Sequence, residues 1–69
     1  MTLRTERLPE FSSVVAICDI EENDTIIPRG ARGCIVDIAR EGYQIEWFDP
    51  VHTVTAAFEW EVEEADNGG

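Results

Sequence analysis

Two short runs of alternating apolar and polar residues constrain the fold of this chain more than any other feature. Residues 34–39 read CIVDIA and residues 43–48 read YQIEWF, so apolar side chains recur at every second position. A period of two places successive side chains on opposite faces of a strand. The intervening residues 40–42 form a tight turn, with Gly42 available for a positive φ angle. The pattern predicts a β-hairpin whose second strand buries one alternate set of side chains: Tyr43, Ile45 and Trp47.

Three further segments read as strands, and none reads as a helix. Residues 14–20 and 51–58 are rich in β-branched side chains, with a possible break of the second near Ala56, and residues 60–64 alternate again. In this last run Trp60 and Val62 are predicted to point inward. Five short strands joined by turns are typical of a small twisted all-β barrel.

A chain of 69 residues forms one domain, and its parts follow from the strand pattern. We predict a loosely ordered lead-in at residues 1–11, a barrel at residues 12–65 and a flexible tail at residues 66–69. Leu8 or Phe11 is expected to anchor the lead-in. One long early loop precedes residue 33, and its two isoleucines are expected to tuck under it: Ile26 and Ile27.

Seven residues in the middle of the chain carry a resemblance to a known group of proteins. They fit a Gly-x-x-Gly stretch that leads into one strand and a Tyr-x-Val-Glu-Phe-like strand that follows: Gly30, Gly33, Gly42, Tyr43, Ile45, Glu46 and Trp47. In this pattern the chain resembles small prokaryotic SH3-like barrel proteins, including a family of short bacterial proteins known as a domain of unknown function. The likeness runs from about residue 14 to residue 64 and implies a five-stranded SH3-like barrel. Such barrels serve as peptide binders, nucleic-acid binders and subunits of larger machines.

The charge of the chain bears most directly on function. Fifteen Asp and Glu residues stand against five Arg and no Lys, for a formal net charge of −10, and no Lys or Arg follows Arg40. Direct binding to nucleic acid or to an anionic membrane is disfavoured, because phosphate would be repelled. The natural complement is a basic protein. The acidity is equally consistent with simple solubility and with adaptation to a high-salt host.

The acidic residues near the C-terminus form the predicted binding site. The site comprises Glu46, Glu59, Glu61, Glu63 and Glu64; on the expected meander the first four face solvent and Glu64 lies at the edge. Ordered carboxylates can imitate the phosphates of a nucleic acid, so we expect a non-catalytic module that blocks a basic, nucleic-acid-handling partner such as a nuclease, CRISPR effector, repressor or toxin. An apolar anchor would come from Phe48, Val54 or Phe58. The alternative is an SH3-like adaptor that docks into a larger complex by a strand edge or by the loop at residues 21–32, with acidity serving only solubility.

Catalysis, cofactors and metal ions are not expected. His52 has no Ser or Cys partner at a recognisable spacing, and the acidic run at residues 19–24 lacks the spacing of a calcium loop. Cys18 and Cys34 are expected to be reduced thiols, with a bridge between them left open. No signal peptide or membrane-length apolar run is present in the sequence, so we expect a cytoplasmic protein. The pattern does not decide the oligomeric state.

Overall fold

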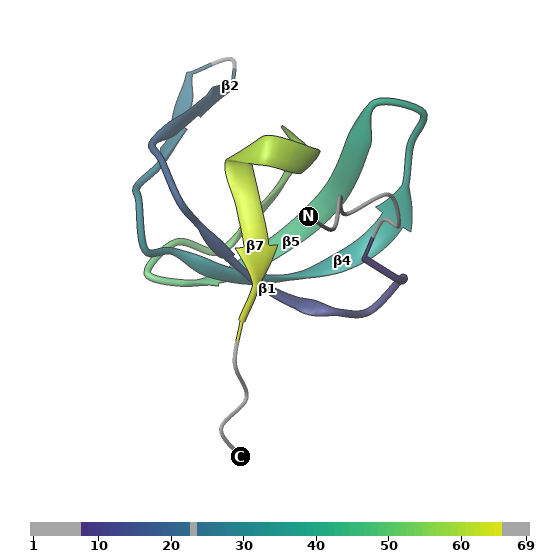
Figure 1. The fold of residues 1–69 in the computed structure, drawn as a ribbon. Coiled ribbons are helices and arrows are strands. Elements are labelled where there is room, and N and C mark those ends of the chain that lie inside the picture. Colours follow the sequence, from purple (N-terminus) through teal and green to yellow (C-terminus); the bar gives the residue numbers. More distant parts are fainter. Residues whose placement is uncertain (1–7, 23, 66–69) are drawn as a thin grey trace, which may run out of the picture.

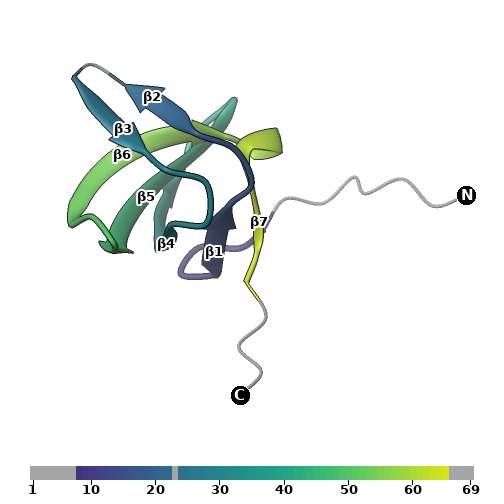
Figure 2. The same ribbon diagram turned by 90° about the vertical axis from the view of Figure 1, so that its left-hand side faces the viewer.

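The fold is all-β, as predicted, and consists of one curved five-stranded sheet and one short hairpin (Figures 1 and 2). The computed structural model describes residues 8–22 and 24–65. The elements are β1 (Ser13–Ala16), β2 (Ile20–Glu22), β3 (Thr25–Ile27), β4 (Arg32–Ile38), β5 (Gly42–Asp49), β6 (Thr53–Phe58), a 3₁₀ turn η1 (Glu59–Glu61) and β7 (Val62–Glu64). The large sheet has the order β6-β5-β4-β1-β7, with every neighbouring pair antiparallel.

The prediction of a five-stranded barrel is confirmed only as to its all-β class, because the described residues form seven strands in two sheets and the large sheet does not close into a barrel. The expected first strand at residues 14–20 is interrupted at residues 17–19, so its end becomes β2. The expected long loop contains β3, which pairs with β2 as a hairpin. The turn η1 carries the chain from β6 to β7, so the two edge strands of the sheet are consecutive in sequence without pairing with each other (Figure 2).

The predicted hairpin is present as β4 and β5. Ile35 lies opposite Ile45, and Gly33 lies opposite Trp47. A Cβ atom at Gly33 would meet Ile45 Cγ2 at 2.7 Å and the Glu46 carbonyl oxygen at 2.8 Å, both closer than real Cβ contacts. Gly33 is therefore required by the close approach of the two strands.

The core lies on the inner face of the curved sheet. Trp47 is buried, and its indole Nε1–H donates a hydrogen bond of 2.8 Å to Thr55 Oγ1 on β6, which is also buried. The largest fully buried side chains besides Trp47 are Ile27, Ile35, Ile45 and Val14. A buried Trp normally has a partner for its N–H, and this one is supplied by the neighbouring strand.

The first described residues show which side chain anchors the N-terminal segment. Leu8 is buried, and its backbone N–H donates to the Tyr43 hydroxyl at 3.0 Å. Leu8 is thus the anchor of the lead-in, whereas Phe11 is 70% exposed and adopts a positive φ of 71°. Residues 1–7 and the predicted tail at residues 66–69 lie outside the described residues.

Three local predictions need correction. Ile27 is buried as expected, but Ile26 on the same strand is 57% exposed because successive residues of β3 face opposite sides. Gly42 does not have the predicted positive φ; among the described glycines Gly30 has one, at 93°. Gly42 is required for a different reason, because a Cβ there would collide with the Ala57 carbonyl oxygen. β6 runs without a break through Ala56.

Helices contribute almost nothing to the part of the chain that the structure describes. The 3₁₀ turn η1 has three residues, and no helix within residues 8–22 and 24–65 has the length and apolarity needed to cross a membrane. The positions of the functional side chains are therefore set by strand pairing and by the turns between strands.

Candidate protein-binding surface

The outward-facing residues of β4, β5 and β6 form a mostly uncharged surface, here called the outer face. The alternation that buries Tyr43, Ile45 and Trp47 turns the other side chains of the hairpin and of β6 outward. These residues are Cys34, Asp37, Gln44, Glu46, Phe48, Val54, Ala56 and Phe58. Two of them are charged: Glu46 in the middle of the face, and Asp37, which lies opposite Gln44.

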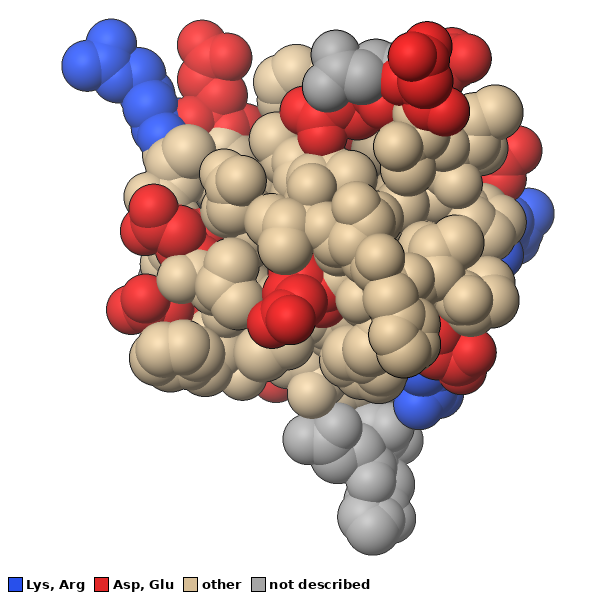
Figure 3. All heavy atoms as spheres, turned by 180° about the vertical axis from the view of Figure 1, so that it is seen from behind, with Lys and Arg blue, Asp and Glu red and all other residues tan. Residues whose placement is uncertain are grey.

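Large apolar side chains are exposed on the outer face, as predicted. The exposed fractions are 48% for Phe48, 50% for Val54 and 43% for Phe58. Seen from behind the view of Figure 1, uncharged residues fill most of the centre of the molecule, and most acidic groups lie around its margin (Figure 3). An apolar patch rimmed by charge is the usual appearance of a protein-binding surface.

An aromatic pair extends the outer face at the end of β6. The rings of Phe58 and Trp60 stack with centroids 4.5 Å apart and an interplanar angle of 5°. The prediction that Trp60 points inward is wrong, since its side chain is 69% exposed. The reason is that residues 59–61 form η1 rather than a strand, so the alternation assumed for residues 60–64 does not begin until β7.

The five predicted binding residues do not form one stripe on a single sheet face. Glu46 lies in the middle of β5, directly opposite Cys34 on β4 and Val54 on β6. Glu59 and Glu61 belong to η1, next to Phe58. Glu63 and Glu64 lie on β7, opposite Val15 and Val14 of β1, at the far edge of the sheet order from β6.

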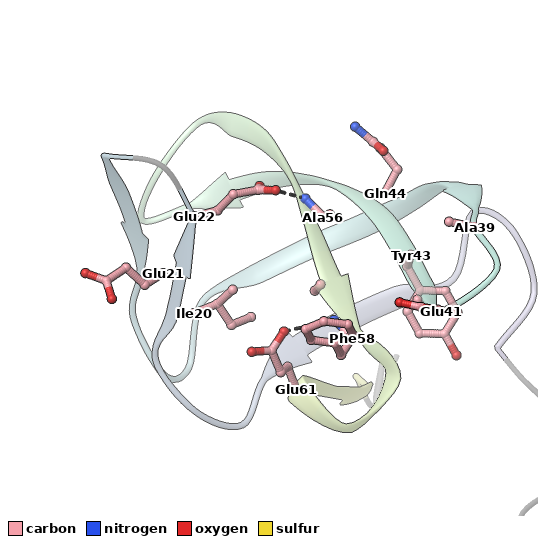
Figure 4. Close-up of a pocket in the computed structure, with 12 residues that line it drawn as sticks. Ile20, Glu21, Glu22, Ala39, Glu41, Tyr43, Gln44, Ala56, Phe58 and Glu61 are labelled. Atoms are coloured by element: carbon pink, nitrogen blue, oxygen red, sulfur yellow. Dashed lines mark hydrogen bonds between the residues drawn. The ribbon is translucent and has the colours of Figure 1, made fainter.

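A hollow of about 280 Å³ opens between the β2–β3 hairpin and β6. Its lining combines apolar residues with four glutamates and includes no basic residue: Ile20, Glu21, Glu22, Ala39, Glu41, Gly42, Tyr43, Gln44, Ala56, Ala57, Phe58 and Glu61. Figure 4 shows the carboxylates of Glu22 and Glu61 on either side of Ile20, while Glu21 points away. The hollow adjoins the outer face, because both include Phe58 and Ala56.

Two of these glutamates also cap the edge of the large sheet. The N–H of Ala56 donates to Glu22 Oε1 at 2.9 Å, and the N–H of Phe58 donates to Glu61 Oε1 at 2.8 Å (Figure 4). An edge strand otherwise presents unpaired N–H groups that can recruit another strand. The two carboxylates therefore protect β6 at the hollow.

The sequence pattern indicates Glu61 but not the other carboxylates of the hollow. In the sequence, Glu21 and Glu22 read only as part of an acidic loop, and Glu41 as part of a turn. The sequence contains a weak hairpin signal, because short β-branched or acidic runs at residues 20–22 and 25–27 flank Asp24. Pro28 and Gly30 follow directly and favour a loop, so the pattern as a whole does not predict this hairpin. The bond between Glu22 and Ala56 joins residues 34 apart in sequence, and no local pattern encodes it.

The structure also bears on a disulfide between the two cysteines and on a metal site formed by acidic residues. Cys18 and Cys34 are both free thiols, so the structure contains no bridge between them. Within residues 8–22 and 24–65 no group of three or more His, Cys, Asp or Glu side chains is arranged to hold a metal ion.

No family model, curated protein or solved structure matches the chain. The resemblance to SH3-like barrel proteins therefore stays a prediction.

Proposed function

We propose that this chain is a non-catalytic protein-binding module that docks its outer face onto a basic, nucleic-acid-handling protein and blocks that partner's positive surface. The observation that carries the proposal is the outer face itself. The chain has a net charge of −10, yet this three-stranded face displays Phe48, Val54 and Phe58 around Glu46, with Asp37 as its other carboxylate.

The apolar residues supply the binding free energy in this proposal. One face of an antiparallel sheet is commonly solvated and carries polar side chains, so apolar residues on both faces favour a second buried surface. Full burial of one large apolar side chain contributes about 1.5–3 kcal/mol relative to exposure. Phe48, Val54 and Phe58 are half-exposed, and Trp60 is more exposed, so all four retain area to bury against a partner.

The charge of the module selects a basic partner. Acidic groups around the margin would accelerate encounter with a positive surface and would repel nucleic acid and other acidic proteins. Glu46, in the middle of the outer face, would then pair with an Arg or Lys of the partner. Binding of a second copy through the same face is disfavoured, because each copy carries a net charge of −10 and the two copies would repel each other.

The apolar content of the outer face also favours a second candidate function. An adaptor that docks into a larger complex would use the same residues, with the acidity serving only solubility. The two functions differ in salt dependence, because steering by exposed charge is screened at high ionic strength whereas apolar contact is not. Strong weakening of the complex by salt supports the basic partner, and near-constant affinity supports the adaptor.

Site-specific photocrosslinking tests the proposed face. A photoreactive phenylalanine analogue replaces Val54 on the outer face, and a matched variant carries it at Glu63, which is exposed on β7. After irradiation in a lysate of the source organism, the proposal expects a discrete protein linked from Val54 but not from Glu63. Its sequence should be basic, and the purified pair should form the same crosslink. Crosslinking from Glu63 alone, or to acidic proteins from both sites, would contradict the proposal.

A further inference from the structure

We infer that the hollow between β2 and β6 receives an arginine side chain. This inference rests on the proposed function for the source of the arginine, which is the bound protein. The chemistry of the site itself follows from the residues that line the hollow and is testable without the partner.

The size of the hollow fits one long side chain. Pockets for drug-sized ligands measure about 300–1,000 Å³. The present one, at about 280 Å³, lies just below that range. Ile20 and Ala57 are both buried and give the lining its apolar part. Long cationic side chains lay their methylene stems along such apolar surfaces while the charged group contacts polar atoms.

The polar lining is complementary to a guanidinium group. Glu22 and Glu61 are half-buried, and each uses its Oε1 atom to accept a backbone N–H. These hydrogen bonds fix both carboxylates at opposite sides of Ile20 (Figure 4). A guanidinium carries several donors in a planar fork and no acceptor, so it satisfies fixed carboxylate oxygens and cannot compete for the two backbone N–H groups.

An aromatic ring completes the complementarity. Phe58 lines the hollow and lies beside Glu61 in Figure 4. Trp60 stacks against Phe58 and holds the orientation of its ring. Guanidinium groups stack readily on aromatic faces, and ammonium groups do so less often. The pairing of carboxylates with an aromatic ring therefore favours arginine over lysine.

A charge-matched peptide pair tests the inference. Acetyl-Gly-Arg-Gly-amide and the same peptide with neutral citrulline in place of arginine are titrated into ¹⁵N-labelled protein at low salt. We expect saturable shifts of the Ala56 and Phe58 amide signals with the arginine peptide and none with the citrulline peptide. A lysine peptide should bind more weakly. Equal shifts with citrulline, equal affinity for lysine, or no shift at these two amides would overturn the inference.

Charge-neutral variants locate the binding. Glu22→Gln and Glu61→Gln keep an oxygen that accepts the β6 N–H groups and remove the negative charge. Each should weaken the arginine peptide by about threefold to fivefold, the upper range for an exposed ion pair. Glu63→Gln, which makes the same charge change on β7, should leave affinity unchanged. Equal loss in all three variants would overturn the inference, because net charge alone would then attract the peptide. The partner is absent from this titration, so the two proposals can fail separately. If the arginine peptide binds but crosslinking from Val54 fails, docking through the outer face is refuted and arginine binding in the hollow is still supported.

Discussion

Replacing Glu46 with threonine is expected to make the free protein more stable. Glu46 is exposed on β5, and its direct neighbours on the adjacent strands are Cys34 and Val54, neither of which carries charge. Glutamate is disfavoured in strands, whereas β-branched residues pack well against cross-strand neighbours. If Glu46 is retained for a partner, the fold carries it at a cost in stability.

The magnitude follows from the pairing. The β-propensity scale spans about 1 kcal/mol, and a favourable cross-strand pair contributes roughly 0.2–1 kcal/mol. These two quantities describe the same contacts, so we expect a gain of about 0.5–1 kcal/mol in the free energy of unfolding for Glu46→Thr. For a domain of this size, that gain raises Tm by roughly 2–8 °C.

Urea unfolding, followed by tryptophan fluorescence, measures this gain, because unfolding exposes the buried Trp47 to water. The control is Gln44→Thr, which introduces the same side chain on the same strand and face without changing charge. We expect Glu46→Thr to gain more than Gln44→Thr, because it also lowers the net negative charge. A midpoint at or below that of the unchanged protein, at constant m value, would refute this reasoning and would show that Glu46 makes favourable contacts in the free fold.

Three further predictions concern stability and the sheet edge. Thr55→Val should destabilise the fold by about 1–3 kcal/mol in urea unfolding, because it leaves the buried Trp47 N–H without its acceptor, while Thr55→Ser should lose only about 1 kcal/mol with the methyl group. Gly33→Ala should cost roughly 1–3 kcal/mol by the same assay, since the added Cβ meets backbone of the next strand, and an unchanged midpoint would contradict that account. Glu22→Ala should speed hydrogen exchange of the Ala56 amide and promote association measured by light scattering, whereas Glu22→Gln should do neither.

The β4–β5 hairpin was predictable because its information is local. Alternation over residues 43–48 determines which side chains are buried, and the structure places Tyr43, Ile45 and Trp47 inside and Gln44 and Glu46 outside, as expected. The same alternation exposes Phe48 and correctly predicts the apolar content of the outer face. Burial along a regular strand can be predicted from its own sequence once it is known which face of the strand meets the core.

Predictions failed where side-chain contacts decide the backbone. Glu61 accepts the N–H of Phe58, and Trp60 stacks on the Phe58 ring, so the chain makes a 3₁₀ turn at a position where alternation predicted a strand. At the hollow, the Ala56 N–H donates to Glu22. The two residues are 34 apart in sequence, so no local pattern predicts this contact. Asp19 accepts the N–H of Arg29 at 2.8 Å across the base of the β2–β3 hairpin, a contact between residues 10 apart in sequence.

The most direct test of the central claim compares two charge reversals in binding to the purified partner identified by crosslinking. Glu46→Lys on the outer face and Glu63→Lys on β7 change the net charge by the same amount, so both alter long-range attraction similarly and only the first alters the proposed contact. Isothermal titration at one fixed ionic strength gives the two dissociation constants. The account predicts a loss of about tenfold or more for Glu46→Lys, through like-charge contact with a basic residue, and a much smaller loss for Glu63→Lys. Equal losses, or a larger loss for Glu63→Lys, would contradict docking through the outer face.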